Sequence, residues 1–212
     1  MKTLAYISGF SILLPAITGL LKFPQAGKAM RVIIGYLLIC LMVECIAMYM
    51  NSIKMNNNLV GDLFYITEGL IFISFFYLVY DEKEFAIPAV LLALVYFAYG
   101  LFTTFVDPGY LEYNGNFRAA ESLMIQALTA YALIKISKQE NLQLLQNPEF
   151  WISAGLFIYF SVNIAVFFTA EFLFENNVML MRKTWLIHSV VNIFANLIFT
   201  FGLICIPVSQ RR

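Results

Sequence analysis

Ionisable side chains lie inside the long apolar stretches of this sequence, where they could bind a ligand or transfer protons. Glu44, Glu68 and Glu171 are such acids, and His188 is the lone histidine. A charge at the centre of a membrane helix costs about 2.5–3.5 kcal/mol, so these groups usually face a bundle interior and mark function. We therefore predict a ligand-binding set made of Glu44, Glu68, Glu121, Asn163, Glu171, His188, Asn192 and Asn196.

These residues are predicted to gather in one half of the membrane. At 1.5 Å rise per residue, Glu44 and Glu68 lie roughly 9–12 Å below the same surface, the one that faces the N-terminus. His188, Asn192 and Asn196 follow at helical spacing, which places them on one stripe of a helix. Stripes of this kind on neighbouring helices predict a polar cavity that opens to the N-terminal face.

A structural interpretation of the same residues stays open. Asn163, Asn192 and Asn196 could only hydrogen-bond helices together, at about 0.6 kcal/mol per contact. Glu121 and Glu171 are predicted near the membrane surface, where a carboxylate could simply reach water. His188 could equally be a structural histidine at the interface.

Several kinds of chemistry are disfavoured by the residue inventory. One histidine cannot form a three-histidine zinc site. The cysteines, Cys40, Cys45 and Cys205, lie in apolar runs without zinc-binding spacing, and no phosphate-binding loop or hydrolase motif occurs. The predicted seventh helix has no lysine for a retinal Schiff base, and the net charge is zero, which disfavours nucleic acid. No cofactor and no metal are therefore predicted.

The elements that must position these residues are membrane helices. The chain of 212 residues is 61% hydrophobic and 12% charged, whereas a soluble domain carries about 25% charged residues. Backbone amides cannot stay unpaired in hydrocarbon, so each apolar stretch of about 20 residues must be a helix. The prediction is an all-α integral membrane bundle, one domain over 1–212. Its seven transmembrane helices span about 4–21, 32–50, 60–80, 85–106, 117–136, 151–174 and 185–207.

Lysine and arginine in the short loops predict the orientation. The N-terminal face carries Lys2, Lys54, Arg118, Arg182 and Lys183, and the C-terminal face carries Lys22, Lys28, Arg31, Lys83, Lys135, Lys138, Arg211 and Arg212. The excess predicts an outside N-terminus and a cytoplasmic C-terminus. The first apolar segment is interpreted as an uncleaved span, because no small-residue cleavage site follows it.

Three segments of the sequence resemble those of a known family. The first is Asn56-Asn57-Asn58 ahead of Tyr65 and Glu68, and the second is the run 147–152 leading into 155–161. The third is the run 192–199, which is followed by Ile206-Pro207. Together they resemble small seven-helix membrane proteins of Bacteroidota whose relatives occur beside or fused to sensor histidine kinases. The resemblance implies an accessory or sensory module of the bacterial inner membrane, with Glu68, Asn192 and Asn196 as pattern positions.

The function predicted from the sequence is receptor-like. The protein would bind a small or lipidic ligand in the outward-facing pocket and signal to a partner, such as a histidine kinase. Membrane lipids would surround the bundle. One alternative is a membrane-embedded lipid-modifying enzyme that uses Glu44, Glu68 and His188 as acid and base. The others are a transporter or proton-coupled channel, and an assembly subunit without a ligand.

Overall fold

The computed structural model describes residues 2–106, 114–139 and 143–207, and within them every regular element is a helix. Seven helical segments are long and apolar enough to cross a membrane, so the chain is a multi-pass membrane protein and the predicted all-helical, seven-span bundle is confirmed. The α-helices are α1 (Lys2–Ser11), α2 (Leu13–Lys22), α3 (Lys28–Ser52), α4 (Asn58–Tyr80), α5 (Ala86–Phe105), α6 (Gly115–Ser137), α7 (Pro148–Asn176) and α8 (Val178–Ile204). Short 3-10 turns cover Phe23–Gln25, Lys83–Phe85 and Leu144–Gln146.

The first span, Thr3–Gln25, is a broken helix made of α1, α2 and the first 3-10 turn. The break falls at Ile12, between α1 and α2. Pro15 explains it, because proline lacks the amide that would bond to the carbonyl of Ser11 and its ring crowds that carbonyl. The break therefore leaves a backbone carbonyl without its helical partner in the middle of the first span.

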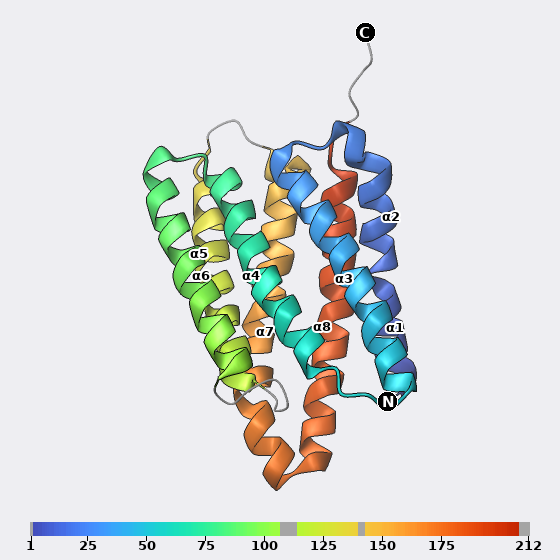
Figure 1. Ribbon diagram of the computed structural model, residues 1–212. Helices are drawn as coiled ribbons and strands as arrows, with labels where there is room; N and C mark the ends of the chain where they lie inside the picture. Colours follow the sequence, from blue (N-terminus) through green and yellow to red (C-terminus); the bar gives the residue numbers. More distant parts are fainter. Residues whose placement is uncertain (1, 107–113, 140–142, 208–212) are drawn as a thin grey trace.

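The helix ends of the last two spans differ from the prediction. The sequence predicted a loop over 175–184, but α7 continues to Asn176 and α8 begins at Val178. Asn177 caps α8, since its side-chain oxygen accepts a hydrogen bond from the Leu180 amide at 3.0 Å. Arg182 and Lys183, which suggested a loop, are good helix formers and continue α8. The resulting α7–α8 hairpin extends past the other helices at the lower end of the bundle (Figure 1).

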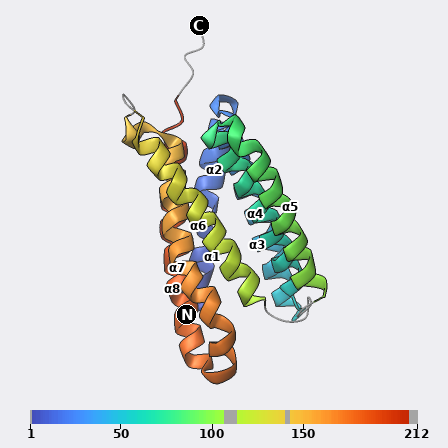
Figure 2. The same cartoon turned by 90° about the vertical axis from the view of Figure 1, so that its left-hand side faces the viewer.

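The helices form two layers. Figure 2 shows α3, α4 and α5 in one layer and α6, α7 and α8 in the other, with α1 and α2 between them at one edge. Consecutive helices pack within each layer, α1 and α2 pack on α8, and α4 packs on α6 across the layers. Since α3 and α7 are only weakly in contact, the layers leave space between them beside α1.

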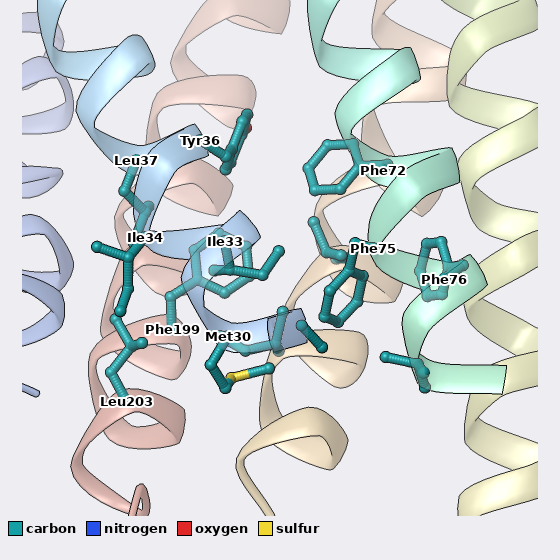
Figure 3. Close-up of a cluster of buried hydrophobic side chains, with 14 of the residues drawn as sticks. Met30, Ile33, Ile34, Tyr36, Leu37, Phe72, Phe75, Phe76, Phe199 and Leu203 are labelled. Atoms are coloured by element: carbon teal, nitrogen blue, oxygen red, sulfur yellow. The ribbon is translucent and has the colours of Figure 1, made fainter. Parts of the chain in front are cut away.

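The apolar core fills the C-terminal-face half of this interface. Figure 3 shows side chains of α3, α4 and α8 directed toward one another. Ile34, Leu37, Phe72, Phe76 and Leu203 are each fully buried in this cluster. Aromatic rings interlock there, with the Phe72 ring 4.7 Å from that of Tyr36 and 5.8 Å from that of Phe160.

Large apolar side chains cover the outside of the bundle, as expected for contact with lipid. On α5, Ile87 is 73% exposed and Val95 is 68% exposed. Exposure on this scale would be unfavourable in water and is favourable against hydrocarbon.

Candidate functional site

A polar cavity of about 470 Å³ occupies the other half of the interface between the layers. Its wall is built from residues of α1, α3, α4, α6, α7 and α8. It reaches the N-terminal face at Asn57 and Asn58, where α4 begins, and ends inside against Leu37, Leu156 and Phe199 of the apolar core. Of the predicted ligand-binding residues, those that line it are Glu44, Glu68, His188, Asn192 and Asn196.

Glu68 is held in the cavity wall by a tyrosine of the facing helix. Its side chain is 3% exposed, and the Tyr36 hydroxyl donates to its Oε1 at 2.6 Å. This distance is at the short end of the range for bonds donated by a hydroxyl group to an oxygen. The Tyr36 ring in turn packs on Phe72, so the apolar core fixes the position of the acid.

Glu44 reaches the cavity from α3, where α1 approaches closely. A Cβ added to Gly9 of α1 would lie 2.5 Å from the Glu44 Oε1, so a side chain at this position would displace the carboxylate. Glu44 is half-buried, and among the described residues it has no hydrogen bond or ion pair. Its oxygens are thus available to a molecule in the cavity.

The amides of α8 tie the broken first span to the bundle. The Asn192 Nδ2 donates to the hydroxyl of Ser8 at 3.0 Å, and the Asn196 Nδ2 donates to that of Ser11 at 2.7 Å. These bonds lie beside the carbonyl that Pro15 leaves unpaired, where polar partners are most needed in a membrane. Both asparagines therefore serve as contacts between helices while they also line the cavity.

His188 is positioned by an amide and by aromatic rings. Its Nδ1 is 2.8 Å from the Oδ1 of Asn163, a fully buried residue that lies behind the cavity wall. The ring of Trp185 stands edge-on at 5.1 Å, and that of Tyr159 lies 5.9 Å away. Asn163 is therefore a positioning residue for His188 and not part of the lining.

Glu121 and Glu171 are the two predicted residues that remain. Glu121 was expected near the membrane surface, but its side chain is 1% exposed and lies outside the lining, toward Tyr96 of α5. The prediction that it could reach water is wrong, because α5 covers this face of α6 near its beginning. The side chain of Glu171 lies outside the described residues.

A buried ion pair was missed in the sequence. Arg118 of α6 lies 3.2 Å from Asp62 of α4, and its guanidinium stacks 4.3 Å from the Tyr65 ring centre. Arg118, at the beginning of the predicted span 117–136, was counted among the basic residues of the N-terminal face, yet it is 6% exposed and lines the cavity. The signal was present in the sequence, since opposite charges stand near the beginnings of two helices that start at the same face.

The wall combines carboxylates, amides, one imidazole and aromatic rings. Within the described part of the chain, no three histidine, cysteine or acidic side chains are grouped closely enough to hold a metal ion. The arrangement can hydrogen-bond a ligand, attract charge and stack against it. In comparisons with known proteins, the chain matches no family model, no curated protein and no solved structure, so its function has to be argued from this cavity.

Proposed function

We propose that this protein is a receptor-like or sensory membrane protein that binds a small or lipidic ligand in the polar cavity and signals to a partner. The observation that carries the proposal is the cavity of about 470 Å³ among membrane helices, with Glu44 and Glu68 in its wall. Its volume lies within the range of about 300–1,000 Å³ that is typical of small-molecule sites. Buried polar residues around such a space are what ligand recognition requires.

The way in which the cavity is built supports signalling. Residues of α3 and α4 in one layer and of α8 in the other (Figure 2) contribute to it, so a bound molecule would bridge the two layers in this half of the bundle. A ligand shifts a conformational equilibrium only if it interacts differently with the two states. A ligand that draws the layers together in the N-terminal-face half meets this requirement, and α3 and α8 would carry the movement to the C-terminal face.

The proposed orientation places the cavity outside and the C-terminal face in the cytoplasm of a bacterial inner membrane. The loop charges favour it, and the structure changes their balance, since Arg118 is buried in an ion pair and does not count as a loop residue. With Arg118 removed, the excess of basic residues on the C-terminal face grows. A membrane-bound histidine kinase remains the proposed partner, on the resemblance alone.

Ligand binding can be measured through Trp185, which lines the cavity. The change Trp151→Phe removes the second of the two tryptophans, which lies against Phe201. Purified protein in nanodiscs is titrated with separate panels of amines, carboxylates, sugars and phospholipids. We expect saturable changes in Trp185 emission and a raised Tm with one class, and Glu68→Gln should weaken that binding about tenfold, or 1.4 kcal/mol.

The exposed Glu84 supplies the matched control, and Glu84→Gln should leave binding unchanged. The proposal fails if Glu68→Gln alters neither the ligand response nor the thermal stability. Chemical conversion of the bound compound, detected by mass spectrometry, would instead indicate a lipid-modifying enzyme. Uptake of the compound into sealed liposomes would indicate a transporter.

A further inference from the structure

The charges around the cavity are unevenly distributed. Glu44 and Glu68 both face it as acids, whereas Arg118, the only lysine or arginine among its described lining residues, is paired with Asp62. Tyr36 occupies one oxygen of Glu68, and the other, Oε2, has no hydrogen-bond partner among the described residues. A side chain that is 3% exposed thus keeps an unpaired carboxylate oxygen at the cavity wall.

Aromatic rings form much of the remaining wall. Positive groups are attracted to the faces of such rings, and the attraction grows when water is excluded. The wall already holds one cation in this way, since the Arg118 guanidinium lies 4.3 Å from the Tyr65 ring centre. The aromatic residues that line the cavity are Tyr36, Phe64, Tyr65, Tyr159, Trp185 and Phe199.

We infer that the cavity binds an organic cation, namely an alkylammonium group whose charge is attracted by the carboxylates in the wall, Glu44 and Glu68, and whose carbon substituents contact the aromatic residues. Bare Ca²⁺ or Mg²⁺ would need six or more oxygen ligands in a tight shell, which a wall of rings does not offer. An anion would meet two carboxylates. The inference rests on the proposed function and names its ligand class.

The ammonium group could belong to a water-soluble amine or to a lipid headgroup, because both carry the same chemistry. Cys40 lines the cavity and provides a reporter for either source. With Cys45→Ala and Cys205→Ala, it is the only thiol left in the chain. The protein is then treated with two methanethiosulfonates of similar size, one with a trimethylammonium group and one with a sulfonate group. Because both reagents react with the thiolate of Cys40, the degree of ionisation of this thiol cancels from the ratio of their rates.

The reference is the exposed Met55→Cys in a protein whose native cysteines are all replaced by alanine. Relative to that reference, the trimethylammonium reagent should label Cys40 about tenfold faster than the sulfonate reagent, as focused fields in charged clefts produce. Glu44→Gln and Glu68→Gln should each reduce the preference. Glu44 makes no hydrogen bond among the described residues and glutamine can still accept the Tyr36 bond, so both variants should fold.

If the ratio of the two labelling rates at Cys40 equals the ratio at the reference, or if the sulfonate reagent reacts faster, the ligand is not a cation. The proposal of a binding pocket would still stand. If neither reagent labels Cys40, the cavity is closed to water, and the proposed function fails together with the inference. Protection of Cys40 by choline in phosphatidylglycerol nanodiscs would support a soluble amine. Protection only by phosphatidylcholine in the nanodisc would support a lipid headgroup, and charge preference without either protection would overturn the ammonium ligand.

Discussion

The two halves of this bundle are built from the same helices but stabilised by different interactions. Toward the C-terminal face, α3, α4 and α8 interlock fully buried aromatic and aliphatic side chains such as Ile34, Phe72 and Leu203 (Figure 3). Toward the N-terminal face, the same helices line a cavity. There, side-chain hydrogen bonds connect α8 to α1 and α3 to α4, and an ion pair connects α4 to α6. Tyr36 and Glu68 mark the boundary, since the ring of one packs on Phe72 while the other lines the cavity.

One half of the bundle holds the helices together, and the other half contains the proposed ligand site. Lipid tails are as apolar as leucine, so association of membrane helices depends on close packing and on hydrogen bonds. The packed cluster is filled by its own side chains, whereas the cavity of the polar half leaves space between the layers and carries unpaired polar groups. A bundle fixed at one end and open at the other can respond to a ligand without coming apart.

The largest expected effect comes from breaking the buried ion pair of the polar half. Asp62→Ala leaves the Arg118 guanidinium without this carboxylate inside the bundle, which should lower the free energy of unfolding by about 3–5 kcal/mol. Unfolding in mixed detergent micelles measures it. The double variant Asp62→Leu/Arg118→Met should recover most of the loss, and a double variant as unstable as Asp62→Ala would show that the pair is not the cause.

A deletion in the packed half should have the next largest effect. Phe72→Ala removes a fully buried ring that contacts Tyr36 and Phe160, and we expect a loss of about 3 kcal/mol from the resulting void. The matched control is Phe168→Ala, because that ring is 71% exposed to the lipid side. Equal Tm shifts for the two variants would contradict a packed core in this half.

The boundary itself can be tested with Tyr36→Phe. This change keeps the ring but removes the hydrogen bond to Glu68, and about 1.5 kcal/mol of stability should be lost because the acceptor is a carboxylate. A double-mutant cycle with Glu68→Leu, which removes the acceptor, isolates the coupling between the two side chains. Additive effects of the two changes would mean that the bond contributes nothing.

The smallest expected effect concerns the amides that attach the broken first span. Asn192→Ala removes the bonds to Ser8 and should cost about 0.6 kcal/mol. The same loss is expected from Ser8→Ala for the hydroxyl part of the contact, with little further loss in the double variant. A change as large as that of Phe72→Ala would place Asn192 in the core of the fold and not at its edge.

Much of this architecture follows from the sequence, because membrane physics leaves few choices. The length and polarity of the apolar runs predicted the helices, and the depth of Glu44 and Glu68 placed them in the half that contains the cavity. The course of the last loop was not predictable in the same way. Arg182 and Lys183 are compatible with a loop or with a helix that extends beyond the membrane. The Asn177 side chain caps the first turn of α8 and so favours the helix.

The site was predicted less completely, since a single sequence gives depth but not which faces meet. Glu121 lies at the expected depth but faces α5, so it is absent from the lining, and Asn163 contacts His188 from behind. Arg118 could have been assigned to the interior by pairing it with Asp62 at the same depth. The aromatic lining could not be distinguished from ordinary core by spacing alone.

Water should enter the cavity of the N-terminal-face half and be excluded from the packed core of the other half. Ala47 lines the cavity on α3, and Ala132 is fully buried on α6 in the packed half. The changes Ala47→Cys and Ala132→Cys are each introduced singly into a protein without native cysteines. Both variants, in nanodiscs, are treated with N-(2-hydroxyethyl)maleimide, a thiol reagent that is small, neutral and water-soluble. We predict labelling at Ala47→Cys and none at Ala132→Cys, whereas equal labelling, or no labelling at Ala47→Cys, would contradict the account.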